Sequence, residues 1–326
     1  MKPFVLRSLF WTATAAVVLA AAPLSAQTFP SKVIRVINPA QPGGNNDFLF
    51  RQLSPKMGEI LGQQLVVDYR PGASTIIGSE ITARSAPDGY TIMINGAVFV
   101  INPAFTDKLP FDPAKDFTPL GLIADLPALL VAHPSLPVKN LAELITLAKA
   151  RPGQIFYSSS GTGALAHLAG ELLNTTVGIK LGHVPYKGAG PAVADVVAGH
   201  VQLSFVSVPA VIGFVRQGRL RMLGQCGATR FQSLPEVPTL IEAGVPDFTV
   251  SSGFHLAGPA GIPRPIAEKL NAALIGALRD PVNRRTLIER GADPIGNTID
   301  EHGAYITSEI TKWKRVVKVA GIKAEL

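Results

Sequence analysis

Short apolar runs alternate along the chain with longer segments in which apolar residues recur every three or four positions. The short runs predict strands, and the longer segments predict amphipathic helices. This alternation indicates an α/β fold with mostly parallel sheets and helices on both faces. The predicted strands are Val33–Ile37, Leu65–Asp68, Thr91–Ile94, Leu129–Ala132, Ile155–Ser158 and Val201–Phe205.

Several helix ends carry recognisable signals. Asn140 with Glu143, and Thr298 with Glu301, predict N-caps with their capping-box partners. Pro55 lies inside an otherwise helical stretch, so we expect that helix to be kinked or broken.

The first 26 residues have the order of a secretory signal peptide. Lys2 and Arg7 precede an apolar run from Leu9 to Ala22, and small residues follow up to Ala26. We therefore expect cleavage after Ala26 and a mature protein in the periplasm. The apolar run is short for a membrane span, and no later stretch is long enough for one.

Composition excludes several classes of partner and cofactor. Without residues 1–26 the chain keeps 28 of its 30 basic residues and all 23 acidic ones, a formal charge of +5. The basic residues are scattered, so we do not expect nucleic-acid binding. Cys226 is the only cysteine, which excludes an intramolecular disulfide. The histidines lack metal-ligand spacing, and we expect no metal or other cofactor.

Two glycine-rich turns, Pro39–Asp47 and Ser158–Gly163, each follow a predicted strand and open a helix. Glycine lets a ligand approach the main chain closely, and a helix N-terminus suits a carboxylate or phosphate. Ligands of open α/β sheets bind beyond the carboxyl ends of the strands. The two turns therefore predict the walls of an anion-binding cleft, if they face each other; the alternative is two ordinary tight turns.

Enzyme signatures are weak. Gly161–Ala166 fits the loose dinucleotide pattern G-x-G-x-x-A, but the acidic residue expected about 20 positions later is missing. Ser159 or Ser160 with His167 could form a hydrolase-like pair, although no third member is identifiable and no G-x-S-x-G elbow occurs. His167 lies one turn after Gly163, and we favour a hydrogen bond from His167 to a backbone group at the helix start.

The roles of two other side chains, Asp47 and Tyr186, each have two possible interpretations from the sequence. Asp47, in the first turn of its helix, either complements the helix dipole or contacts the ligand. Tyr186 either lines the cleft or packs at an edge.

A series of short motifs occurs in one order along nearly the whole mature chain. They are Pro42-Gly43-Gly44 with Asp47, Arg70-Pro71-Gly72-Ala73, Ala86-Pro87-Asp88-Gly89-Tyr90-Thr91, Leu109-Pro110-Phe111-Asp112 with Asp116-Phe117, Ala142-Glu143-Leu144, Ser159-Ser160-Gly161 with His167-Leu168, Val184-Pro185-Tyr186-Lys187-Gly188, Leu234-Pro235-Glu236-Val237-Pro238-Thr239, Glu242-Ala243-Gly244 and Pro259-Ala260-Gly261. In this order and spacing the chain resembles the substrate-binding proteins of tripartite tricarboxylate transporters, the Bordetella uptake gene or TctC-like family.

The resemblance implies a type II periplasmic-binding-protein fold, with two doubly wound α/β lobes and a ligand cleft between them. We expect 27–128 with 253–326 to form lobe 1 and 129–252 to form lobe 2. The resemblance further implies a binding protein rather than an enzyme, a small carboxylate ligand and an inner-membrane permease as partner, and we expect a monomer. The residues expected to bind the ligand are Ala40, Gln41, Pro42, Gly43, Ala73, Ser74, Thr75, Ser159, Ser160, Gly161, Thr162, Ala164, His167, Tyr186, Val206, Ser207 and His255.

Departures from the family pattern bear on the ligand. The family often has a bulky residue at Ala40, a hydroxyl residue at Ala164 and Trp at Gly253, so we expect an enlarged pocket. An acid is frequent at Val206, and its loss disfavours amino acids. We therefore expect a larger or partly apolar carboxylate, such as an aromatic or longer-chain acid.

Two more departures concern polar positions. The family usually has Gly-Gly and then Asn where this chain has Ser74, Thr75 and Ile76, and Ile76 should make the pocket more apolar. His255 replaces a glycine, and it either contacts a polar group of the ligand or fills the space of the missing Trp. Two other functions stay open, namely a periplasmic sensor that presents its ligand to a signalling partner and, more remotely, a secreted hydrolase.

Overall fold

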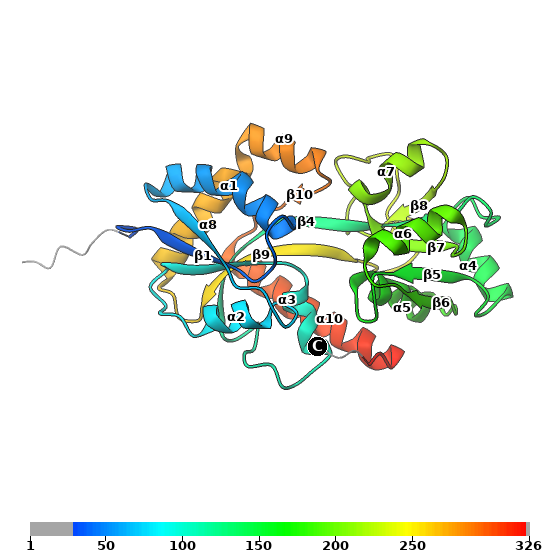
Figure 1. Ribbon diagram of the computed structural model, residues 1–326, viewed down its shortest axis with the longest axis horizontal. Coiled ribbons are helices and arrows are strands. Elements are labelled where there is room, and N and C mark those ends of the chain that lie inside the picture. Colours follow the sequence, from blue (N-terminus) through cyan, green and yellow to red (C-terminus); the bar gives the residue numbers. More distant parts are fainter. Residues whose placement is uncertain (1–28, 324–326) are drawn as a thin grey trace, which may run out of the picture.

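The computed structural model describes residues 29–323; the predicted signal peptide therefore lies outside the described residues. The strands form one ten-stranded sheet, and each end of this sheet is the centre of one lobe, here called lobe 1 and lobe 2 (Figure 1). Lobe 1 contains β1 (Ile34–Asn38), α1 (Asn45–Leu61), β2 (Leu65–Tyr69), α2 (Ile76–Ala83), β3 (Thr91–Asn95), α3 (Val98–Ile101), a 3-10 helix (Asn102–Ala104), β9 (Ser251–Pro259), α8 (Arg264–Arg279), α9 (Pro281–Glu289), β10 (Asp293–Pro294) and α10 (Ile299–Ala320). Lobe 2 contains α4 (Leu141–Ala150), β5 (Phe156–Ser159), α5 (Leu165–Val177), β6 (Gly182–Pro185), α6 (Ala189–Ala198), β7 (Leu203–Ser207), α7 (Val208–Arg216) and β8 (Arg221–Gln225).

One long strand, β4 (Phe117–Ala132), belongs to both lobes. Its first part pairs with β9 and β10 in lobe 1, and its last part pairs with β7 and β8 in lobe 2. The strand order is β2-β1-β3-β9-β4-β7-β5-β6, with β8 and β10 also on β4. Figure 1 shows β4 and β9 running from one lobe toward the other. The lobes are therefore joined by neighbouring strands rather than by a flexible linker.

The C-terminal helix α10 also bridges the lobes. It packs on α3 and β4 of lobe 1 and on α5 of lobe 2. Its buried residues Trp313, Val316 and Val317 share one apolar core with Leu168 and Leu172 of α5. Burial of this apolar face of α10 stabilises the contact of the C-terminal helix with both lobes.

The structure confirms the α/β class, the predicted strand positions in outline and both capping signals. Asn140 accepts a hydrogen bond from the Glu143 N–H at 2.9 Å, and Thr298 and Glu301 form the capping box of α10. The expectation that Pro55 kinks or breaks its helix is wrong as to a break, because α1 continues through Pro55, and a kink stays a prediction. Pro55 is exposed, so the carbonyl that loses its partner faces water.

The sheet is less parallel than expected. The pairs β1–β2, β1–β3, β5–β6 and β5–β7 are parallel, but β4 and β9 are antiparallel to their neighbours. The predicted strand Leu129–Ala132 corresponds only to the last part of β4. The first part of β4 was not predicted, because it contains Pro119 and Gly121, which flank a register shift of the strand. Within 29–323 no helix is both long and apolar enough to cross a membrane.

Candidate functional site

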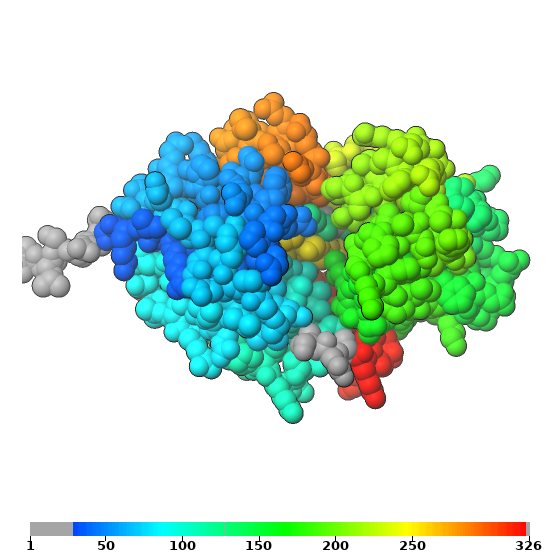
Figure 2. Space-filling view, in the orientation of Figure 1, coloured from blue at the N-terminus to red at the C-terminus, as the bar shows by residue number. Residues whose placement is uncertain are grey.

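Two neighbouring chambers lie between the lobes, beyond the carboxyl ends of β1, β3, β5 and β7. The larger has a volume of about 500 Å³ and the smaller about 190 Å³. Asn45, Ser160, Leu165 and Ser252 line both, so the chambers lie side by side, and together they are called the cavity here. Figure 2 shows the hollow between the blue and cyan atoms of lobe 1 and the green atoms of lobe 2.

Five helices of eight residues or more begin at the cavity lining: α1, α2, α5, α6 and α7. None has a side chain that caps its first turn. By contrast, Asn140, Asp280 and Thr298 cap three of the four described helices of this length that begin elsewhere, α4, α9 and α10, whereas α8 begins after Pro263 without a side-chain cap. An uncapped start keeps N–H groups and a partial positive charge exposed. No charged residue is among the described residues that line either chamber, so the cavity suits an anion.

The corner before α2 forms part of the lobe 1 wall in an unusual conformation. Ala73, Ser74 and Thr75 have φ angles of 44°, 48° and 72°, in the left-handed region that disfavours residues with a Cβ. The Asn102 side chain donates to the Ser74 carbonyl at 2.9 Å, and Asn95 donates to Thr75 Oγ1 at 3.3 Å. Strain held in place by neighbouring groups is typical of functional sites.

Asparagines fix the neighbouring strand ends of the same wall. Asn46 Nδ2 donates to Asn38 Oδ1 at 3.2 Å and to the Ile94 carbonyl at 3.3 Å. Asn95 Oδ1 accepts from the Gly96 N–H at 2.8 Å. The carboxyl ends of β1 and β3 are thereby held together beside α1.

The loop between β5 and α5 forms the facing wall in lobe 2. Gly161 and Gly163 have φ angles of 148° and 81°, which only glycine adopts without strain. Ser159 Oγ lies 2.6 Å from His183 Nε2. The Gly163 N–H donates to His167 Nδ1 at 3.0 Å, which confirms that His167 bonds a backbone group at the helix start.

The two histidine rings behind this loop are stacked. The centroids of His167 and His183 are 3.7 Å apart and the ring planes differ by 6°. Burial lowers the pKa of each ring to about 4, and for His183 the neighbouring His167 lowers the pKa further. Both rings are therefore neutral at neutral pH. The sequence did not point to His183, because its partners lie on other elements.

The smaller chamber is largely apolar. Serine hydroxyls are its only side-chain polar groups apart from Asn45 among the described residues. The apolar residues of its lining are Leu126, Ala128, Leu165, Ala166, Ala189, Ala192, Val193, Phe205, Val206 and Ala210. The larger chamber is more polar, and its lining includes Asn45, Asn46, Ser74, Thr75, Asn95, Asn102, Ser160, Thr162 and Ser252.

The structure brings together many, but not all, of the residues predicted to bind a ligand. Those in the cavity lining are Ala40, Ser74, Thr75, Ser159, Ser160, Gly161, Thr162, Ala164, Val206 and Ser207. Those outside the lining are Gln41, Pro42, Gly43, Ala73, His167, Tyr186 and His255. Ligand contact by any of them stays a prediction.

Asp47 stabilises the turn before α1. Its carboxylate accepts hydrogen bonds from the Gly43 N–H at 2.9 Å, from Arg51 Nε at 2.9 Å and from the Tyr69 hydroxyl at 2.5 Å. Desolvation alone would raise the pKa of Asp47, but the hydrogen bonds from Tyr69, Gly43 and Arg51 outweigh it and lower the pKa. This ionised group is fully engaged within lobe 1, which favours the role at the helix start over ligand contact.

Tyr186 and His255 also have partners inside the protein. The Tyr186 hydroxyl donates to Asp195 at 2.5 Å, and its ring packs against an apolar cluster of lobe 2. His255 is fully buried, and its Nδ1 lies 2.9 Å from His302 Nε2. These contacts favour the packing interpretation of each residue.

The expectation that Gly253 enlarges the pocket is wrong. A Cβ on Gly253 would lie 2.6 Å from the Tyr305 hydroxyl, so Tyr305 occupies the space that a larger residue would need. Ile76 likewise lies outside the lining. Ala40 and Ala164 do line the larger chamber.

Several lining residues were missed by the sequence analysis. They include Asn95, Gly96, Asn102, Phe105, Ser252 and Phe254. Asn95 and Gly96 come directly after the predicted strand Thr91–Ile94, so the rule that ligands bind at strand ends could have found them. Ser252 could not be found this way, because β9 itself was not predicted.

The serine–histidine pair does not resemble a hydrolase site. Ser159 lies next to His183 rather than His167. Ser159 is buried, and its hydroxyl also donates to the Gly161 carbonyl at 2.9 Å. Ser159 also belongs to the lining of the smaller chamber, but its hydroxyl is engaged by both His183 and the Gly161 carbonyl, which gives it a role in shaping the loop. Among residues 29–323 no cluster of three His, Cys, Asp or Glu side chains could hold a metal.

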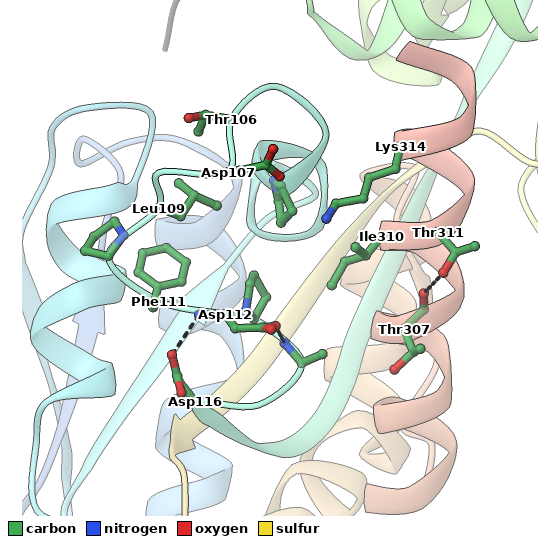
Figure 3. Close-up of a pocket in the computed structure, with 14 residues that line it drawn as sticks. Thr106, Asp107, Leu109, Phe111, Asp112, Asp116, Thr307, Ile310, Thr311 and Lys314 are labelled. Atoms are coloured by element: carbon green, nitrogen blue, oxygen red, sulfur yellow. Dashed lines mark hydrogen bonds between the residues drawn. The ribbon is translucent and has the colours of Figure 1, made fainter. Parts of the chain in front are cut away.

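Another hollow lies outside the cleft, between the loop at Thr106–Asp116 and α10 (Figure 3). Its volume is about 490 Å³. Asp107, Asp112 and Asp116 line it beside the single base Lys314. No predicted ligand-binding residue lies there, and its acidic lining would repel a carboxylate.

Two α/β lobes joined by through-going strands, with an uncharged cavity of helix N-termini between them, define a solute-binding protein of the periplasmic-binding type. The chain matches the family model described as "Tripartite tricarboxylate transporter family receptor" over residues 49–322. It belongs to this family and is a periplasmic solute-binding receptor of the TctC and Bug type, with the corresponding fold.

Relatives agree with this assignment. The chain is 36% identical to protein BugT of Bordetella pertussis over 305 residues, 93% of this chain and 94% of that protein. An R. palustris protein solved with adipate shares 35% identity and a TM-score of 0.72, over 90% of this chain and 99% of that one. MatC from Rhodopseudomonas palustris, solved with bound malate, shares 30% identity and a TM-score of 0.68, over 89% and 100%.

Proposed function

We propose that this protein captures an organic acid in the periplasm and delivers it to the inner-membrane permease of a tripartite tricarboxylate-type transporter. The observation that carries the proposal is the convergence of five uncapped helix starts on a cavity with an uncharged lining. A carboxylate there meets N–H donors and favourable dipoles. A cation would meet no carboxylate among the described residues of the lining.

The two chambers suggest how such an acid lies. The larger, polar chamber takes the carboxylate, and the smaller, apolar chamber takes a hydrocarbon part. Val206 lines the smaller chamber, where an acid would be needed to pair with an amine. We therefore propose an aromatic or longer-chain acid rather than an amino acid. The adipate and malate complexes of two relatives support the carboxylate class.

The connection of the lobes suggests the mechanism. We propose that 27–128 with 253–326 forms lobe 1, that 129–252 forms lobe 2, and that the two move as a monomer about β4 and β9. Ligand contacts from both lobes are made together only in the closed state, so the ligand favours closure. The permease would recognise that closed state, and residues 1–26 would direct export.

A thermal-shift screen tests the ligand class. The purified protein is mixed with mono-, di- and tricarboxylic acids, aromatic acids, amino acids and sugars. A ligand present at about 100 times its dissociation constant should stabilise the protein by about 2.7 kcal/mol. Hits confined to acids with an apolar part support the proposal. Tight binding of a small amino acid, with no such acid bound, contradicts it.

A substitution in the smaller chamber provides the matched variant. Val206→Asp should weaken binding of an apolar acid by about tenfold or more, because a carboxylate would replace an apolar wall and repel the anion. Equal affinity of this variant would show that the hydrocarbon part does not lie in the smaller chamber.

A further inference from the structure

The loop between β5 and α5 is held at both ends by histidines that do not line the cavity. At its start, Ser159 Oγ lies 2.6 Å from His183 Nε2, on β6. At its end, the Gly163 N–H donates to His167 Nδ1 at 3.0 Å, on α5. The residues between these two anchors, Ser160 to Thr162, line the larger chamber.

The two anchors are joined through the rings themselves. His167 and His183 stack at 3.7 Å with nearly parallel planes, so a shift of one ring displaces the other. Tyr157 stacks on His183 at 5.1 Å, and its hydroxyl donates to Glu171 at 2.8 Å. A Cβ on Gly170 would lie 2.2 Å from the Tyr157 ring, so glycine there leaves room for the ring.

We propose that His167 and His183 are positioning residues for ligand capture, which hold this loop in its binding conformation from behind. The proposal rests on the proposed function of the cavity. The rings touch no ligand themselves. They act by fixing Ser159 and Gly163, and through them the wall of the larger chamber.

Neutral rings are a condition of this arrangement. His167 Nδ1 accepts the Gly163 N–H only while it carries no proton. Protonation would set a donor against that N–H and would place two positive rings 3.7 Å apart. Burial lowers the pKa of both rings to about 4. The titratable groups that face them are Tyr157 and Glu171, and the Glu171 carboxylate raises the pKa of His183.

Paired substitutions separate positioning from simple packing. His183→Leu and His167→Leu fill the space of each ring but remove its polar atoms. His183→Gln keeps an amide that can reach Ser159, and His167→Asn keeps an acceptor near the position of Nδ1. Calorimetry at about pH 7.5 with phenylacetate and adipate as probes should show a loss of about tenfold in affinity for each Leu variant, as for one lost hydrogen bond.

The conservative variants and a distant control complete the test. His183→Gln and His167→Asn should bind the probes within about threefold of the unchanged protein, because they keep the polar contact. His133→Gln is the control, since His133 lies in lobe 2 and contacts Ser135 away from the cavity. Folded Leu variants with unchanged affinity would overturn the proposal.

A second measurement needs neither a variant nor a ligand. In the ¹⁵N-labelled protein, titrated from about pH 7.5 to about pH 3, the Gly161 and Gly163 amide signals should move with the midpoint of the two histidine rings, at about pH 4. If the Gly161 and Gly163 amide shifts do not change at that midpoint, the proposal is overturned, even if the probes bind and the proposed function holds. Amide shifts that do change at that midpoint, in a protein that binds neither probe, support the positioning role and count against the proposed function alone.

Discussion

Each lobe contains a stacked pair of histidines, and the pairs differ in what they touch. In lobe 1, His255 and His302 are fully buried, and His302 Nδ1 accepts the Gly121 N–H at 3.0 Å. Neither ring lines the cavity, although His255 packs against Phe99 of α3, whose Val98 and Ile101 line the larger chamber. In lobe 2, His167 and His183 hold the wall of the larger chamber. A stacked histidine pair therefore supports the core in lobe 1, and a second such pair supports the wall of the ligand site in lobe 2.

The electrostatic difference follows from burial. Desolvation lowers the pKa of His302 to about 3 and that of His255 well below its usual value, where the neighbouring His302 contributes as well. The less buried pair of lobe 2 has pKa values of about 4. All four rings are neutral at neutral pH, and the lobe 1 pair resists protonation more strongly.

Acid should destabilise the protein through both histidine pairs, and the lobe 1 pair should contribute more only below about pH 4. The folded state keeps these rings neutral, whereas the unfolded chain binds protons below about pH 6.5. Their contribution to stability is complete above that pH and is lost as the pH falls toward the folded pKa values. For His302, with a folded pKa of about 3, the loss reaches about 2 to 3 kcal/mol by about pH 4.5.

Urea unfolding between about pH 8 and about pH 4.5 measures this loss. His302→Asn keeps an acceptor for the Gly121 N–H but does not titrate, so its stability should depend less on pH. His183→Gln should flatten the curve to a similar extent down to about pH 4.5, and the two variants should differ only when the measurement is extended to about pH 3, where the lower pKa of His302 matters. At about pH 7.5 His302→Asn should bind an acid as the unchanged protein does. A full pH dependence in His302→Asn would contradict the comparison.

Asp125 offers a way to separate a second titration in lobe 1. Its Oδ1 is buried without a hydrogen-bond partner. The pKa of Asp125 is raised to about 6, chiefly by desolvation and also by the nearby Glu309 and Asp293, while Ser251 and Lys312 act to lower it. A raised acid pKa acts in the opposite sense to the histidines. It costs stability as the pH rises from about 4 to about 6.

Asp125→Asn should therefore stabilise the protein by about 1 to 2 kcal/mol at about pH 7.5, with the gain fading by about pH 4. Unfolding curves at both pH values check this, and Asp107→Asn on the exposed surface serves as the control. A gain that is equal at both pH values would assign the effect to packing rather than to ionisation.

Local signals were sufficient for much of the fold. Period and length gave the positions of β1, β2, β3, β5 and β7, and Asn140 and Thr298 marked the starts of α4 and α10. The first part of β4 was hidden, because Pro119 and Gly121 are poor strand residues and are tolerated only at its register shifts. A strand that joins two lobes depends on its neighbours more than on its own sequence.

The site was predictable where it follows strand ends, as at Ala40 and Ser160. The histidine pairs were not, because each joins residues brought together only by the fold. His167 and His183 lie on a helix and a strand of lobe 2, and His255 and His302 are 47 positions apart. Their stacking depends on how those elements pack, which no local spacing records.

The smallest expected effect concerns the backbone of the two cavity walls. The wall of lobe 1 places Ser74 in the left-handed region with φ 48°, whereas lobe 2 uses Gly161 with φ 148°. Ser74→Gly removes a strain of about 1 kcal/mol but makes the unfolded chain more flexible, so we expect a net gain of about 0.5 kcal/mol. Gly161→Ala should lose stability, because its conformation suits only glycine.

Affinity gives the other half of this prediction. If the Ser74 hydroxyl contacts the ligand, Ser74→Gly should bind an acid several-fold more weakly while it unfolds at higher denaturant, so that stability and affinity change in opposite directions. Urea unfolding and calorimetry on the same preparation measure both. If Ser74→Gly is less stable than the unchanged protein, the backbone at Ala73–Thr75 is not strained. The two cavity walls would then differ in sequence but not in backbone energy.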